Sequence, residues 1–179
     1  MSRRGPPGRE TAAARSNERR TWYGWGQLTR VEKNRFGLFL HDSPRMFAEV
    51  SLVSLPVLLL VMASPPTGWF DAKATGLVAW AVAVVVGTLV RIGLVRPFAT
   101  RTLGWVTLDP WLTVLRIPYF NVGLGVAIFG GLAVDGAVTW LGGGDLVGVG
   151  TGLVWTGTVA AGVVLAFPRI AEAWLSVVR

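Results

Sequence analysis

Side chains suited to hydrolysis or metal binding are few in this chain. The single histidine, His41, stands directly before Asp42 and Ser43. Because a Ser-His-Asp site or a histidine metal site needs groups from separate positions that converge on one point, we interpret Asp42 and Ser43 as the turn that opens a helix. The chain has no cysteine, which excludes thiolate chemistry. We therefore predict no catalytic residue, no metal site and no cofactor. A protein that is not an enzyme is expected, and a lipid-acting membrane enzyme is the third alternative.

Three ionisable residues lie near the ends of long apolar runs, where the burial of a charge is costly. Glu49, Arg91 and Arg116 are predicted at a similar depth near one membrane surface. If they face inward, they form an intramembrane cluster of one carboxylate and two guanidinium groups. If they face outward, each reaches the nearby headgroups as an anchor, which arginine does readily near helix ends. We expect the anchors and keep the inward cluster as the candidate site.

A transport pathway or a proton relay would need polar groups in the middle of the membrane. Ser54 and Thr156 are the two residues that we place there. Hydroxyl groups in such positions more often satisfy backbone carbonyl groups or bridge helices. A small transporter or channel that forms its pathway by homo-oligomerisation is therefore the second alternative.

Four long apolar runs must position these residues. Hydrophobic residues make up 52% of the chain and charged residues 15%, whereas charged residues make up about a quarter of a typical soluble domain. Each run is close to the roughly 20 residues with which a helix crosses the hydrocarbon core, and none shows the alternation of a barrel strand. We predict an all-α integral membrane protein, a four-transmembrane-helix bundle. The predicted spans are residues 46–64, 72–95, 117–134 and 146–168.

Prolines mark the predicted ends and bends of these spans. Ser43-Pro44 has the pattern of a helix start, and Pro56 predicts a kink inside the first span. Asp109-Pro110 repeats the starting pattern, and Pro118 predicts a kink or a restart of the third span. Pro168 likewise predicts a kink or a restart at the end of the fourth span. The residues after it, 169–179, are predicted to form a C-terminal interfacial helix.

Small residues recur at every fourth position in three of the spans. In lipid, a stripe of small residues lets two helix backbones approach and gain dispersion contacts. We therefore predict that these stripes are helix-packing faces. The residues are Ala79, Ala83 and Gly87 in the second span, Gly123, Ala127 and Gly131 in the third, and Gly148 and Gly152 in the fourth.

The charges predict the orientation in the membrane. If the N-terminus is cytoplasmic, four crossings leave every basic residue except Lys73 on the cytoplasmic side, and the two opposite loops carry Asp71, Asp135 and Asp145. Basic residues are retained on the cytoplasmic side. Both termini are therefore predicted in the cytoplasm, in a plasma (inner) membrane. The arginine-rich composition hints at a prokaryotic source.

Three cytoplasmic segments outside the spans combine aromatic, apolar and basic residues. These are the juxtamembrane amphipathic segment 21–45, the hairpin 101–120 and the C-terminal segment 169–179, while residues 1–20 have the composition of a disordered basic tail. Trp105, Trp111 and Tyr119 are of the types that lie at headgroup level. We expect these segments to anchor the protein to the bilayer, or alternatively to form a docking platform.

The predicted function follows from this basic cytoplasmic face. We expect a non-enzymatic accessory or scaffold subunit, which contacts anionic lipid headgroups and a membrane or cytoplasmic protein partner. Nucleic acid is not an expected partner, because the basic tail carries no aromatic platform before Trp22 and anionic lipid lies closer to it.

Overall fold

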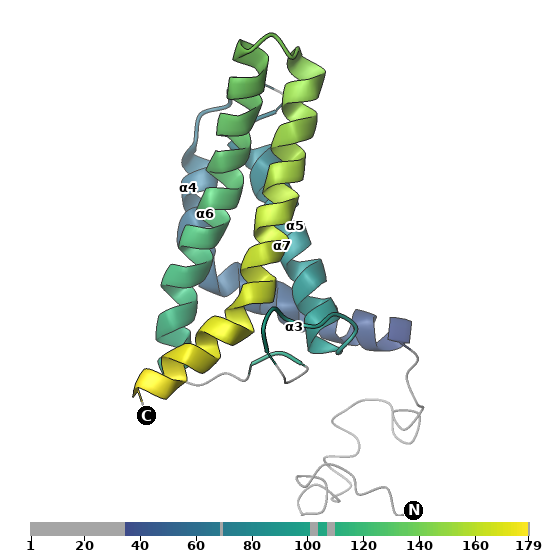
Figure 1. Cartoon of the computed structure of the whole chain (residues 1–179), viewed down its shortest axis with the longest axis vertical. Coiled ribbons are helices and arrows are strands. Elements are labelled where there is room, and N and C mark those ends of the chain that lie inside the picture. The colour runs from purple at the N-terminus through teal and green to yellow at the C-terminus, as the bar shows by residue number, and fades with distance from the viewer. Residues whose placement is uncertain (1–34, 69, 101–103, 107–109, 179) are drawn as a thin grey trace, which may run out of the picture. The chain divides into compact units, whose positions relative to one another are not determined.

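A computed structural model describes residues 35–68, 70–100, 104–106 and 110–178, and all regular secondary structure in these ranges is α-helical. The prediction of an all-α fold is confirmed. Residues 1–34, which include the predicted tail and most of the juxtamembrane segment, lie outside the described ranges. The helices in Figure 1 are α3 (Arg35–Val53), α4 (Leu55–Ala63), α5 (Ala72–Arg91), α6 (Pro110–Trp140) and α7 (Asp145–Val178).

Three of these helices are long and apolar enough to cross a membrane. They are α5, α6 and α7, and the bent pair of α3 and α4 counts as a fourth candidate span. The axes of α3 and α4 differ by 71°, so the kink predicted near Pro56 is present, with Ser54 between the two helices. Because α4 has nine residues and a helix rises 1.5 Å per residue, α4 by itself is too short to cross the hydrocarbon core.

The predicted start of the first span is wrong. Helix α3 begins at Arg35 and runs through Pro44, so Ser43-Pro44 does not open a helix. The Ser43 hydroxyl donates to the Phe39 carbonyl one turn earlier, at 2.7 Å. A proline inside a helix removes one backbone hydrogen bond. Packing outweighs that loss here, because Met46 and Val50 on the same helix are fully buried.

Other helix ends differ from the bounds of the predicted spans. Helix α5 ends at Arg91 instead of residue 95, whereas α6 continues through Pro118 and α7 through Pro168. Buried apolar residues lie on both sides of each of these two prolines, namely Leu112 and Phe120 on α6 and Phe167 and Ala171 on α7. The segment 169–179 is therefore not a separate helix: up to Val178 it is the end of α7, which changes direction there (Figure 1).

The helices bury a single apolar core to which all five contribute. Helix α7 packs most extensively against α6 and next against α5, while α3 packs against α5. Figure 1 shows α3 lying crosswise near one end of α5, α6 and α7, and the α6–α7 hairpin extending beyond α4 and α5 at the other end. Asp71 caps α5 by accepting hydrogen bonds from the backbone N–H groups of Lys73 and Ala74, at 2.9 and 3.0 Å.

Candidate functional site

Charged side chains from three helices meet at the end of the bundle where α3 lies. Glu49 of α3 lies 3.1 Å from Arg116 of α6 (Oε1 to Nη1) and 3.9 Å from Arg91, the last residue of α5 (Oε2 to Nη1). The Arg116 side chain is 0% exposed, that of Glu49 11% and that of Arg91 29%. Arg116 therefore does not reach a headgroup layer as an isolated anchor. The three candidate residues have the geometry of the inward cluster.

A second carboxylate joins them. Asp42 Oδ1 lies 3.7 Å from Arg91 Nε and 3.8 Å from Arg45 Nη1. Asp42, Arg45 and Glu49 follow one another on α3 at spacings of three and four residues, which brings them to one helix face. The sequence did not indicate Asp42 as a member of this cluster, because Asp42-Ser43-Pro44 has the pattern of a helix start. The spacing is a usable signal once α3 is known to begin at Arg35. We call Asp42, Arg45, Glu49, Arg91 and Arg116 the charged network.

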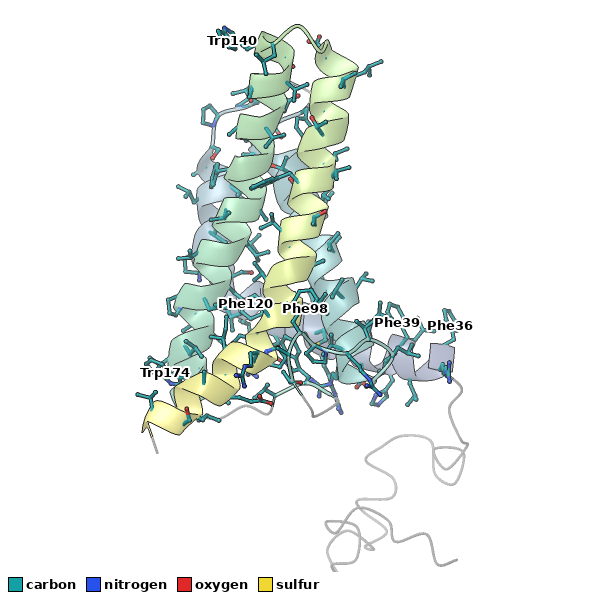
Figure 2. The ribbon with its side chains drawn as sticks, in the orientation of Figure 1. Phe36, Phe39, Phe98, Phe120, Trp140 and Trp174 are labelled. Atoms are coloured by element: carbon teal, nitrogen blue, oxygen red, sulfur yellow. The ribbon has the colours of Figure 1, made fainter. Side chains whose placement is uncertain are left out.

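Aromatic side chains enclose the buried part of the charged network. Trp105 Nε1 donates to Glu49 Oε1 at 2.8 Å, and Arg116 Nη2 donates to the Val106 carbonyl at 2.6 Å. The Phe167 ring centroid lies 5.3 Å from Arg116 Cζ and 5.5 Å from the Trp105 ring. The Phe120 ring lies 5.3 Å from the Phe167 ring. Figure 2 shows Phe120 far from Trp140, which lies at the other end of the bundle. A guanidinium group over an aromatic face gains a cation–π interaction, so this shell stabilises the buried charge.

Two of the aromatic residues predicted at headgroup level use their polar groups within the protein, and their depth in a membrane stays a prediction. Trp105 binds Glu49 inside the protein, and the Tyr119 hydroxyl donates to the Val163 carbonyl of α7 at 2.9 Å. Both polar groups are thus satisfied by this chain and not by a lipid headgroup. The side chain of Trp111 lies outside the described part of the structure.

The charged network borders an open cleft of about 490 Å³. Arg45, 61% exposed, and Arg91 reach this cleft, whereas Arg116 is not among the residues that line it. The cleft is lined by Asp42, Arg45, Glu49, Arg91, Gly104, Trp105 and Val106. The network thus has a buried pair, Glu49 with Arg116, and an accessible pair of guanidinium groups. Such groups can bind carboxylate or phosphate oxygens.

A second polar group, which was not among the predicted site residues, enters the bundle at the bend between α3 and α4. Asn121 of α6 accepts a hydrogen bond from the Val57 N–H at 2.8 Å and donates to the Val53 carbonyl at 2.8 Å. In an unbroken α-helix these two backbone groups would bond to each other. The Asn121 amide replaces that bond and holds the bend open. The sequence signal for this role was the amide of Asn121 within an apolar span. Because an amide both donates and accepts hydrogen bonds, it can pair with a backbone N–H and a carbonyl at once.

The two mid-span hydroxyl groups bond to backbone carbonyl groups, as such hydroxyls commonly do. Ser54 Oγ donates to the Val50 carbonyl at 2.5 Å, and Thr156 Oγ1 lies 3.1 Å from the Ala127 carbonyl and 2.9 Å from the Gly152 carbonyl. Thr156 therefore links α7 to α6. Both side chains are fully buried.

The predicted packing residues lie within the bundle. Ala79, Ala83 and Ala127 are fully buried, Gly87, Gly131, Gly148 and Gly152 are buried, and Gly123 is partly buried. A Cβ atom added at Gly152 would lie 2.7 Å from the Gly131 carbonyl oxygen, and one added at Gly131 would lie 3.0 Å from the Gly152 carbonyl oxygen. The backbones of α6 and α7 therefore approach too closely at this point for either position to carry a side chain without a shift.

Comparisons with known proteins place the chain in a family. Neither the curated proteins nor the solved structures give a match. A family model matches residues 33–174, which is more than half of the chain and includes every residue of the charged network as well as Asn121. The chain therefore belongs to the family described as Domain of unknown function (DUF8215).

Proposed function

We propose that this chain is a non-enzymatic accessory or scaffold subunit of the plasma membrane. The bent pair of α3 and α4 together with α5, α6 and α7 makes four crossings, both termini are cytoplasmic, and the end of the bundle that carries the charged network faces the cytoplasm. This basic face, with residues 1–34, binds a protein partner.

One observation carries the orientation. Each long helix has an acidic residue at one end and a basic residue toward the other: α5 runs from its cap Asp71 to Arg91, and α7 has Asp145 at its start and Arg169 near its end. In α6 the order of the charges along the chain is reversed, because Arg116 precedes Asp135. Because the three helices alternate in direction (Figure 1), their basic ends gather together. The positive-inside rule supports a cytoplasmic location for that end.

The docking role draws support from α3. This helix lies crosswise at the basic end (Figure 1) and exposes Phe36, Leu40 and Phe47. The first half of α3, before buried Met46, carries apolar and basic side chains and is suited to lie in the membrane interface with its apolar side in lipid, while the rest of α3 makes the crossing together with α4. The first half would thereby hold Arg35 and Arg45 at the membrane surface, where a partner can reach them.

Single cysteines test the orientation without background, because the chain has none. Exposed Trp140 at the α6–α7 turn and exposed Val177 near the end of α7 are suitable positions. We expect Trp140→Cys to react with a membrane-impermeant maleimide on intact cells, and Val177→Cys to react only after lysis. The reverse pattern would show that the proposed orientation is wrong.

A truncation tests the scaffold role. Removal of residues 1–34 leaves all five described helices whole, since α3 begins at Arg35. We expect a partner to co-purify with the full chain from the native host in mild detergent and to be lost with the truncated chain. Trp140→Ser, a change at the opposite end, is the control and should keep the partner. If the full chain is recovered alone, the scaffold role is wrong.

A further inference from the structure

Arg45 and Arg91, the two arginines that line the cleft, form ion pairs but no short hydrogen bonds with the carboxylates beside them. Arg91 lies 3.7 Å from Asp42 and 3.9 Å from Glu49, and Arg45 lies 3.8 Å from Asp42. These distances exceed the usual 2.7–3.2 Å of an N–H···O hydrogen bond. Within the part of the chain that the structure describes, these ion pairs are the polar contacts of both side chains. Their N–H groups therefore remain available to a ligand in the cleft.

The charges of the network favour an anion. Three guanidinium groups, those of Arg45, Arg91 and Arg116, face two carboxylates, those of Asp42 and Glu49, so one positive charge is in excess. Glu49 already accepts a hydrogen bond from Trp105 and lies against Arg116. It is therefore engaged, and a ligand with one negative charge would balance the network.

The depth of the cleft points to the source of that anion. Arg91 is the last residue of α5, a candidate span of 20 residues, which matches the length of a helix across the hydrocarbon core. A group bound at Arg91 would lie where the hydrocarbon ends and the phosphate layer begins. The cleft volume of about 490 Å³ is within the range of small-molecule sites, about 300–1,000 Å³.

We propose that this cleft binds the phosphate group of one anionic phospholipid, with Arg45 and Arg91 as the donors. Glu49, which is paired with buried Arg116, positions Arg91 through their ion pair. Trp105 forms part of the cleft lining. The inference rests on the proposed function in one respect, since it needs this end of the bundle at a membrane surface. A phosphodiester carries a single negative charge and oxygens that two arginines can share.

Lipid retention in native mass spectrometry tests the proposal on the full chain in detergent. Phosphatidylglycerol and zwitterionic phosphatidylcholine are added in turn to the unmodified chain and to the Arg91→Gln, Arg45→Gln and Arg169→Gln variants. Arg169 is the matched control, because it is 60% exposed, pairs with Glu172 and does not line the cleft. We expect phosphatidylglycerol to bind roughly tenfold more weakly to both cleft variants, which corresponds to about 1.4 kcal/mol, and equally well to the control.

Several outcomes would overturn the proposal. Equal loss of lipid in all three variants would indicate general surface electrostatics, and unchanged binding in both cleft variants would exclude the cleft. Displacement of the lipid by millimolar glycerol 3-phosphate would make a soluble phosphate compound the ligand. If Arg91→Gln loses helicity by circular dichroism, its lipid binding is not interpreted. The phosphatidylglycerol binding of the exposed Arg45→Gln variant then tests the proposal, and unchanged binding would overturn it.

The two proposals fail separately. Labelling of Trp140→Cys only after lysis would overturn the orientation, whatever the lipid measurement gives. Unchanged phosphatidylglycerol binding in the cleft variants, with normal labelling and a co-purified partner, would overturn only the lipid site.

Discussion

The charged network and the Asn121 bridge are two ways of placing polar groups among apolar helices. In the bridge, one amide takes up the Val57 N–H and the Val53 carbonyl at the bend, so its oxygen and its nitrogen both have partners within the protein. In the charged network, Glu49 and Arg116 are enclosed, while Arg45 and Arg91 border a cleft with ion pairs too long for hydrogen bonds. A polar group whose hydrogen bonds are satisfied within the protein stabilises the fold, whereas a group with N–H donors not used in hydrogen bonds is suited to bind a ligand.

The largest effect is expected from Glu49→Gln. Removal of one partner of a buried ion pair leaves the other charge uncompensated, which costs about 3–5 kcal/mol. The free energy of unfolding, measured by titration with sodium dodecyl sulfate in mixed micelles and circular dichroism, checks this. Glu172→Gln is the control, because Glu172 pairs with exposed Arg169 and surface pairs contribute about 0–1 kcal/mol. Similar losses in both variants would mean that the network is not the stabilising feature we describe.

Asn121→Leu should have the next largest effect and should act on the bend. At the present bend, each of the two backbone groups would be left without a partner at a cost of about 1–3 kcal/mol. The bend of 71° between α3 and α4 should therefore decrease, so that Val57 regains its bond to Val53. Spin labels at Leu40→Cys and Met62→Cys report the angle as a distance, which should lengthen. Val122→Leu, at an exposed neighbouring position, should leave that distance unchanged. An unchanged distance in Asn121→Leu would show that the bend does not depend on the amide.

Trp105→Phe should cost less and should separate the two parts of the charged network. The variant loses the hydrogen bond to Glu49, worth about 1.5 kcal/mol for a charged acceptor, while a ring remains against Phe167. Stability should decrease by that amount in the detergent titration, and phosphatidylglycerol binding should decrease less than in Arg91→Gln. A larger loss of lipid than of stability would make the indole itself a binding group.

Ser54→Ala should have the smallest effect. The hydroxyl bonds to the Val50 carbonyl, which already accepts the Ser54 N–H at 3.0 Å, so its loss leaves no backbone group without a partner. We expect a change within about 0.5 kcal/mol and an unchanged distance between the labels used for Asn121. A change of bend in this variant would assign the bend to Ser54.

The fold was predictable where hydropathy and small-residue spacing decide it. The apolar runs gave α5, α6 and α7, and the stripe through Ala79 and Ala83 is buried as expected. The helix-start rule failed at Pro44, and the helices continue through Pro118 and Pro168, where buried residues on both sides of each proline pack against other helices. Local backbone preference is worth a few kcal/mol at most, and packing exceeds it at these positions.

The candidate site was predictable only in part. Glu49, Arg91 and Arg116 stood out because charge within apolar sequence is costly, and the structure brings them together. The roles of Asp42, Trp105 and Asn121 did not stand out. Asp42 depends on where α3 begins, Trp105 on the path of the connection between α5 and α6, and Asn121 on which helix α4 packs against.

By itself, the sequence determined that this chain forms apolar helices with its basic residues gathered toward one end, because hydropathy and charge are properties of each segment. Only the tertiary structure decided that Arg116 is enclosed with Glu49, that Arg45 and Arg91 border an open cleft, and that Asn121 replaces a backbone bond of another helix. Those contacts join residues far apart in the chain, and they depend on the rotation and bending of each helix, which packing against its neighbours sets.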